Sequence, residues 1–246
     1  MHPLLNHIIG DALAELGQGE SPVPFVTVVT DLGSAHAAWF SPRARRIYLP
    51  TEKSRTVGKK FCSPKNLSVK GIPLRKAFWG GALSDEERAR KKTSLHLTSG
   101  TCVLLMQGGS GENIVPLAHD IGVMMAARKD HRETTLIIIT GRNEAAKDEL
   151  KKMRWYDSWK PLILGYVDDI EDYMSVADVF VTKAGHAAIA EALALELPIL
   201  ATGHVVNEEE GNISLIEGAG VGTYADGSDP ENVAESGRLR PGAAAS

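Results

Sequence analysis

The stretch from Val179 to Leu200 constrains the fold of this chain more than any other part of the sequence. It predicts a short buried strand, a glycine turn at 183–185, an amphipathic helix and a second strand entered at Pro198. A strand that turns directly into a helix leaves the first helical amides facing open space, where they and the helix dipole attract anions such as phosphate. Glu191, further along the helix, is placed to accept the paired hydroxyls of a ribose. The segment therefore predicts a nucleotide site.

Strands alternate with helices along the rest of the chain, which favours an α/β fold with parallel sheets. The natural boundary lies near Gly80–Gly100, and we expect domains at 1–85 and 86–226. The segment 227–246 is rich in Gly, Pro, Ala and Ser, and we expect a disordered tail there. The predicted strands are Phe25–Thr30, Arg46–Leu49, Leu67–Lys70, Val103–Met106, Thr135–Thr140, Leu162–Gly165, Val179–Thr182 and Leu197–Ala201. The predicted helices include one starting near Ser84, and Val115–Arg128, Glu144–Met153 and Ile170–Val176.

Composition excludes several classes of function. A formal net charge of -4 gives no support for a nucleic-acid partner, which needs clustered Lys and Arg. Two cysteines are too few for a disulfide framework, so a reducing compartment is expected. No apolar run reaches the roughly 20 residues of a spanning helix. No targeting peptide is visible at the start, and the histidines and cysteines show no metal-ligand spacing.

A second glycine-rich turn follows the predicted strand at 103–106. Gly108, Gly109 and Gly111 lie between this strand and a helix, so their amides could approach a diphosphate closely. The alternative is a plain tight turn. Arg142, after the next strand, could pair with a phosphate or form an ordinary salt bridge, and the sequence leaves both open.

Several ordered motifs resemble those of one enzyme family. Residues 182–192 are similar to the pattern Thr-Lys-Ala-Gly-Pro-Gly-Thr-Ile-Ala-Glu-Ala of the monogalactosyldiacylglycerol synthases, with His-Ala-Ala replacing Pro-Gly-Thr. Further similar motifs are Val26-Thr-Val-Val-Thr-Asp-Leu32, His36-Ala-Ala-Trp-Phe40, Gly71-Ile-Pro-Leu-Arg75, Gly141-Arg-Asn143 and Glu208-Glu-Glu-Gly-Asn212. The chain thus resembles glycosyltransferase family 28 along most of its length.

The resemblance implies a GT-B fold, in which two Rossmann-like lobes with parallel sheets face each other. The acceptor then binds mainly to the N-terminal lobe and the sugar nucleotide to the C-terminal lobe. His2-Pro-Leu-Leu-Asn-His7 resembles a segment well inside the family's first domain. The family's Gly-Gly-Gly-His loop and closing C-terminal helices have no counterpart here. We therefore expect an incomplete N-terminal lobe, a chain cut short at both ends, and weak or absent transferase activity.

The resemblance also implies a set of donor-binding residues, some of which have an ordinary structural alternative. Glu208 and Glu209 suit hexose hydroxyls, or complement a helix start, and both roles are compatible. His186 could donate to phosphate or be an exposed turn histidine, and Gly165-Tyr-Val167 could face uracil or merely end a strand. The full predicted set is Gly108, Gly109, Gly111, Arg142, Tyr166, Lys183, Gly185, His186, Ala187, Glu191, Glu208, Glu209 and Asn212.

Two residues of the first lobe are candidate catalytic groups. Asp31 and His36 lie on a loop after a strand, the usual place for functional residues in an α/β fold. A carboxylate near a histidine could serve as general base toward a glycerol hydroxyl. A purely structural hydrogen bond is the alternative for the histidine.

These observations predict a transferase that moves galactose from UDP-galactose to diacylglycerol at a membrane surface. The resemblance implies a peripheral membrane protein of the plastid envelope. We expect no cofactor and no required divalent metal, since the helix amides and the glycine loop can stabilise the leaving diphosphate. Two alternatives remain: a related transferase using UDP-N-acetylglucosamine, and a non-catalytic donor-binding module. In the second case a partner chain would supply the missing N-terminal region.

Overall fold

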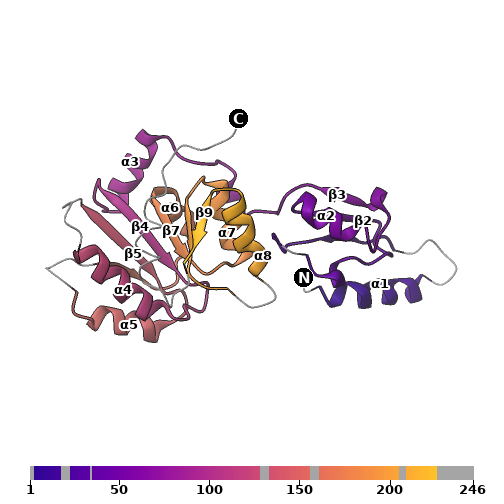
Figure 1. Cartoon of the computed structure of the whole chain (residues 1–246), viewed down its shortest axis with the longest axis horizontal. Coiled ribbons are helices and arrows are strands. Elements are labelled where there is room, and N and C mark those ends of the chain that lie inside the picture. The colour runs from indigo at the N-terminus through magenta and orange to yellow at the C-terminus, as the bar shows by residue number, and fades with distance from the viewer. Residues whose placement is uncertain are drawn as a thin grey trace.

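A computed structural model of the chain contains two parallel β-sheets, each with its own helices (Figure 1). The predicted α/β class with parallel sheets is confirmed. The glycine- and alanine-rich segment 227–246 lies outside the described residues. The structure describes residues 3–17, 23–33, 35–127, 133–155, 161–204 and 209–225.

The first sheet has three parallel strands in the order β1-β2-β3. These are β1 (Val26–Val28), β2 (Arg46–Leu49) and β3 (Leu67–Val69), and helices α1 (Leu5–Leu16) and α2 (Glu52–Gly58) belong to the same lobe. Short 3₁₀ turns stand at Ala37–Trp39 and Pro64–Asn66. The three predicted strands are present, whereas neither helix was predicted.

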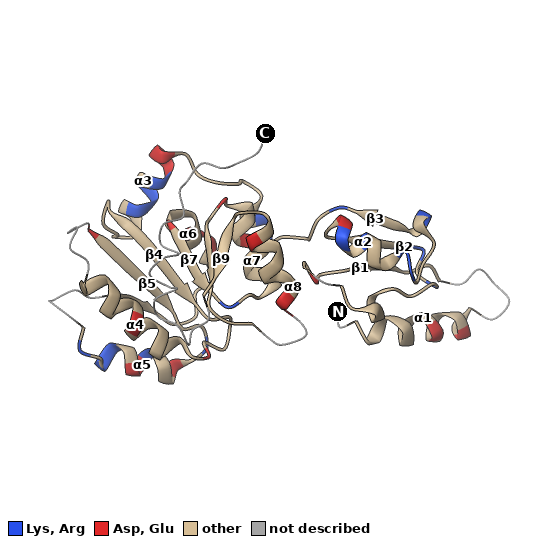
Figure 2. Cartoon of the chain, in the orientation of Figure 1, with Lys and Arg blue, Asp and Glu red and all other residues tan. Residues whose placement is uncertain are grey.

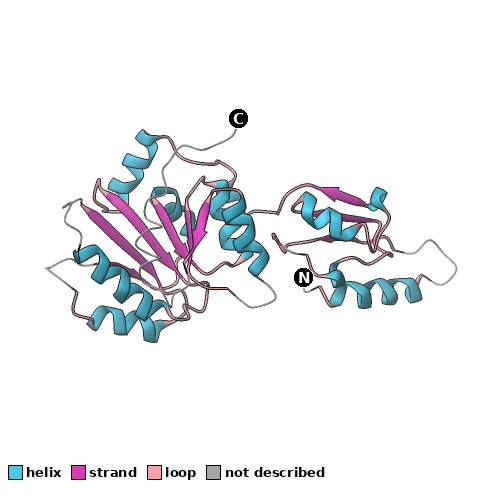
Figure 3. Cartoon of the chain, viewed as in Figure 1, coloured by secondary structure: helices cyan, strands magenta, loops and turns pink. Residues whose placement is uncertain are grey.

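The second sheet has six parallel strands in the order β6-β5-β4-β7-β8-β9 (Figure 3). Its strands are β4 (Thr101–Met106), β5 (Thr134–Ile139), β6 (Leu162–Leu164), β7 (Val179–Thr182), β8 (Ile199–Ala201) and β9 (Gly222–Tyr224). Its helices are α3 (Asp85–Ser94), α4 (Ile114–Ala127), α5 (Glu144–Lys152), α6 (Ile170–Val176), α7 (His186–Ala194) and α8 (Glu210–Gly218). Strand order reverses between β4 and β7, and ligands of such sheets bind at the carboxyl ends beside the reversal.

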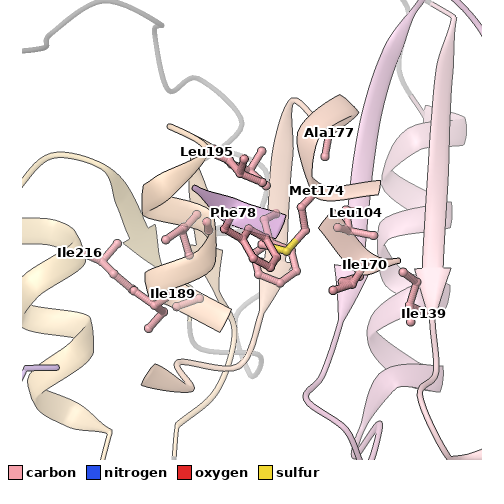
Figure 4. Close-up of a cluster of buried hydrophobic side chains, with 14 of the residues drawn as sticks. Phe78, Leu104, Ile139, Ile170, Met174, Ala177, Ile189, Leu195 and Ile216 are labelled. Carbon is pink, nitrogen blue, oxygen red and sulfur yellow. The ribbon is translucent and has the colours of Figure 1, made fainter. Parts of the chain in front are cut away.

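Successive strand residues face opposite sides of the second sheet, and helices cover both sides. Leu105 and Ile138 pack with side chains of α4 and α5. Leu104 and Ile139 pack on the other side with side chains of α6, α7 and α8 (Figure 4). Because both faces are buried, the strands are continuous apolar runs, which is why the sequence predicted them well.

The segment that follows β3 packs against the second sheet, not the first. Phe78, in a 3₁₀ turn at Lys76–Phe78, is 1% exposed and lies in the core that includes Ile189 and Met174 (Figure 4). Ile72 and Leu74 pack against the same core. The connection is therefore anchored to the second lobe well before α3 begins.

Helix α3 is fixed by charge at both of its ends (Figure 2). Ser84 and Glu87 form a capping box at its start, and their hydrogen bonds lower the pKa of the Glu87 carboxyl. Lys91 pairs with Asp172 of α6 at 2.7 Å. The helix is thereby joined to the second sheet, and the predicted helix start at Ser84 is confirmed.

Candidate functional site

The loop at 107–111, called the glycine loop, follows β4 and has an open side and a packed side. Gly108 and Gly111 have φ values of +65° and +59°, which favour glycine. A Cβ atom at Gly108 or Gly109 would meet nothing within 4 Å, so a ligand can approach the backbone there. A Cβ atom at Gly111 would lie 2.6 Å from the Thr140 carbonyl oxygen, so this glycine is required for packing.

The turn after β5 packs directly on the glycine loop. The Arg142 amide donates to the Gly109 carbonyl oxygen at 3.2 Å, and Asn143 caps α5 by accepting from the Ala146 amide at 2.9 Å. The Arg142 guanidinium lies 5.6 Å from the centre of the Tyr166 ring, a cation–π distance. The structure thus brings together two predicted donor residues that are 24 positions apart.

The turn at 183–185, called the phosphate turn, follows β7 and leads into α7 without a side-chain cap. The Gly185 amide donates to Lys183 O at 2.7 Å, and the first helical bond runs from the Ile189 amide to Gly185 O at 3.0 Å. The amides between these two, including those of the exposed residues His186 and Ala187, come before the first helical hydrogen bond and so have no acceptor within the helix. Such amides at a helix start form an anion site.

The two loops meet where the strand order reverses. Met106 of β4 is paired with Thr182 of β7, so the glycine loop and the phosphate turn leave the sheet side by side. Gln107 Nε2 donates to Thr202 Oγ1 at 2.9 Å, which also ties in the loop after β8. The open glycines and the uncapped helix start therefore belong to one edge of the sheet.

Glu209 stands beside the phosphate turn. Its Oε2 lies 3.9 Å from Lys183 Nζ, and its Oε1 lies 3.8 Å from the position of a Cβ atom at Gly185. Its side chain is 12% exposed. The positive charge of Lys183 offsets this carboxylate where a phosphate would bind. Glu208 lies outside the described residues, and its predicted sugar contact stays a prediction.

Glu191 has a partner that the sequence did not suggest. Its Oε1 accepts from Arg75 Nε at 2.9 Å, and its side chain is only 14% exposed. Arg75 ends the Gly71–Arg75 motif in the connection between the two lobes. A residue 116 positions away thus contacts the predicted ribose carboxylate.

Asn212 lies at the junction of the two lobes and is 2% exposed. Its Oδ1 accepts from the Gly33 amide at 2.9 Å, and its Nδ2 donates to the Ala184 carbonyl oxygen at 2.8 Å. One side chain therefore joins a loop of the first lobe to the phosphate turn. Its predicted donor contact stays a prediction, and the structure gives it this second role.

A family model described as "Glycosyltransferase family 28 C-terminal domain" matches residues 104–213. The match runs from β4 into α8, so it includes the glycine loop, the phosphate turn and Asn212. The chain contains a glycosyltransferase family 28 C-terminal domain. Its glycine loop, phosphate turn and Glu191 are therefore parts of a family 28 C-terminal lobe.

Plant relatives match nearly the whole chain. It is 33% identical over 229 residues to the chloroplastic monogalactosyldiacylglycerol synthase of Spinacia oleracea, covering 91% of this chain and 42% of that protein. It is 33% identical over 238 residues to the probable monogalactosyldiacylglycerol synthase 2 of Oryza sativa subsp. japonica, covering 95% of this chain and 49% of that protein. The chain spans about half the length of the curated relatives it matches.

Solved structures share the fold at low sequence identity. MurG of Acinetobacter baumannii matches with a TM-score of 0.62 and 11% identity, covering 94% of this chain and 60% of that chain. The glycotransferase of kitacinnamycin matches with a TM-score of 0.55 and 17% identity, covering 82% of this chain and 48% of that chain. The chain has the predicted GT-B type of α/β fold.

The two catalytic candidates of this chain have separate partners. Asp31 Oδ2 accepts from Trp39 Nε1 at 2.6 Å. His36 Nδ1 accepts from the Ala38 amide at 3.1 Å and caps the following 3₁₀ turn. The ring's basic lone pair is thus used by the backbone, and the described residues show no hydrogen bond between Asp31 and His36. The structure does not pair the two groups, because each is occupied locally.

A hollow of about 330 Å³ opens at the start of α4, behind the glycine loop. Its described lining residues include Glu112 and Glu149 and no Lys or Arg. Two negative groups without a cation disfavour an anionic diphosphate there. We therefore expect the phosphates on the opposite side of the loop, toward α7.

In the described part of the chain, no three His, Cys, Asp or Glu side chains gather closely enough to hold a metal ion. None of its helices combines the length and the apolar character needed to cross a membrane.

Proposed function

We propose that this chain carries the donor site of a hexosyltransferase that moves galactose from UDP-galactose to diacylglycerol, forming monogalactosyldiacylglycerol. The observation that carries the proposal is the uncapped start of α7 beside the open face of Gly108 and Gly109. Amides from both lie at the edge where parallel α/β sheets bind ligands. The similarity to the plant synthases supports galactose as the sugar and diacylglycerol as the acceptor.

The negative charge of the donor diphosphate is complementary to the positive groups of the site. The diphosphate lies at the start of α7, with the Lys183 ammonium next to it, and the ribose lies near Glu191. Arg142 follows β5 and Tyr166 follows β6, at the end of the site away from α7. The uracil base is accommodated there. Glu209 lies next to the phosphate turn, where the transferred sugar joins the diphosphate.

The reaction forms one bond and breaks another at the anomeric carbon. The acceptor hydroxyl oxygen bonds to that carbon while its bond to the β-phosphate oxygen breaks, and the acceptor proton passes to a base. UDP leaves with the negative charge. The amides of α7 and of the glycine loop stabilise this charge, usually a large part of such catalysis. Since these amides supply the stabilisation, we propose that no divalent metal and no cofactor is needed.

The remaining parts of the proposal concern partners and place. The chain attaches peripherally to a membrane surface and binds the acceptor lipid there. By analogy with the chloroplastic relatives, this membrane belongs to a plastid. Nucleic acid is not a partner. Asp31 and His36 are each hydrogen-bonded locally and, among the described residues, not to each other. This favours a second candidate function, a donor-binding module completed by a partner chain that supplies the base.

Titration calorimetry of the purified chain tests donor binding with UDP, UDP-galactose and UDP-N-acetylglucosamine. Binding of UDP, with tighter binding of UDP-galactose than of the N-acetylglucosamine donor, supports the proposal. A folded chain that binds no uridine nucleotide contradicts it. Transfer to diacylglycerol, measured with and without a chelator, then separates an enzyme from a binding module and tests the metal.

A further inference from the structure

Arg75 is the one residue between the lobes that contacts the predicted ribose carboxylate in the described part of the chain. Its Nε donates to Glu191 Oε1 at 2.9 Å. The arginine side chain is 50% exposed, whereas the glutamate side chain is 14% exposed. A shielded carboxylate gains more from such a pair than a fully exposed one, because water screens it less.

The position of Arg75 is fixed by its neighbour Phe78. The Arg75 guanidinium carbon lies 5.0 Å from the centre of the Phe78 ring, and that ring is buried in the core beneath α7 (Figure 4). An arginine stacked on an immobile ring loses less freedom when it forms a hydrogen bond. The guanidinium is therefore held next to Glu191 before any ligand arrives.

The pair leaves half of the carboxylate for a ligand. Glu191 Oε2 has no hydrogen bond to any of the described residues, while Oε1 is taken by Arg75. An ionised carboxylate accepts at both oxygens, and hydrogen bonds to charged acceptors are the strong ones. The hydrogen bond from the guanidinium to Oε1 orients the carboxylate and so fixes the direction of Oε2.

We propose that Arg75 is a positioning residue that makes Glu191 selective for a nucleotide with an intact ribose diol. This inference rests on the proposed donor function. Arg75 itself contacts the carboxylate, not the ribose. It should therefore matter for nucleotides that carry the 2′- and 3′-hydroxyls and lose its effect when those hydroxyls are absent.

The test compares UDP with 2′,3′-dideoxyuridine diphosphate by titration calorimetry on the full chain. Wild type should bind UDP more tightly than the dideoxy compound. Arg75→Gln should weaken UDP about tenfold, as expected for one charge-assisted hydrogen bond, and should change binding of the dideoxy compound less than about twofold. Arg75→Lys should restore part of the lost UDP affinity, since it keeps the charge but not the planar donor.

A matched control uses the exposed pair Arg43–Asp11, 2.8 Å apart, in the first lobe. Arg43→Gln should leave both affinities unchanged, and circular dichroism confirms that each variant is folded. If Arg75→Gln weakens both ligands equally, the positioning role is overturned and the donor site still stands. If folded wild type binds neither ligand, the donor proposal fails along with the inference.

Discussion

Replacing Asn212 with alanine should destabilise the protein by removing two buried hydrogen bonds at once. The side chain is 2% exposed and bridges the Gly33 amide and the Ala184 carbonyl oxygen at 2.9 and 2.8 Å. Each backbone group left unpaired in the interior costs about 1–3 kcal/mol. Partial entry of water reduces the sum, so we expect a loss of about 2–4 kcal/mol in the free energy of unfolding.

Thermal and urea unfolding followed by circular dichroism measure this loss. The expected fall in Tm is roughly 4–16 °C, at about 2–4 °C per kcal/mol for a domain of this size. Asn212→Asp provides a contrast, because it keeps the acceptor for Gly33 but turns the donor toward Ala184 into a second acceptor. The exposed Ser214 of the same helix supplies the control, and Ser214→Ala should stay within about 0.5 kcal/mol of wild type. An Asn212→Ala protein as stable as that control would refute the junction role.

Three further outcomes are expected. Glu191→Ala should cost about 1–3 kcal/mol of UDP binding by calorimetry, and unchanged affinity in a folded variant would rule out its ribose contact. Glu209→Ala should weaken UDP-galactose while nearly sparing UDP. Equal losses for both would mean that Glu209 only shapes the start of α8. Burial raises the pKa of the Cys62 and Cys102 thiols, so both stay protonated at neutral pH. Alkylation followed by mass spectrometry should label them only after denaturation, and rapid labelling of native protein would contradict their burial.

The sequence predicted the second lobe well because its signals are local. Buried strands such as β5 are uninterrupted apolar runs, and glycine turns mark where they end. The three-residue β9 was missed, since its pattern is too short to show a period and it is paired only with β8. Burial by tertiary contacts, not local preference, makes it a strand.

The two helices of the first lobe were missed for different reasons. Helix α1 has apolar residues at helical spacing, among them Leu5, Ile8 and Leu16, but it exposes this side and buries Asn6 and Gly10 instead. Helix α2 spans only seven residues of mostly polar character, and its clearest signal was Thr51, whose side chain caps it. Helix α2 alone lacks the apolar periodicity on which sequence-based prediction depends.

The candidate site was predictable where it follows strands and not where it depends on distant pairs. Glycine turns after β4 and β7 indicated the edge of the sheet at which they meet. The pairing of Arg75 with Glu191 joins residues 116 positions apart, and no local pattern encodes it. The double hydrogen bond of Asn212 likewise appears only once Gly33 and Ala184 are brought together by the fold.

The anchoring of Phe78 to the second lobe determines which contacts a motion between the lobes would break. Gly71 precedes the anchored segment, has a φ of +82° and has nothing within 4 Å of its Cβ position, so no neighbouring atom blocks backbone rotation there. Swinging the first lobe about this point would release Gly33 from Asn212, yet Arg75 would travel with Glu191. Under the proposed function, the lobes could separate at this junction while the nucleotide stays bound, so that acceptor exchange and donor release would be separate events.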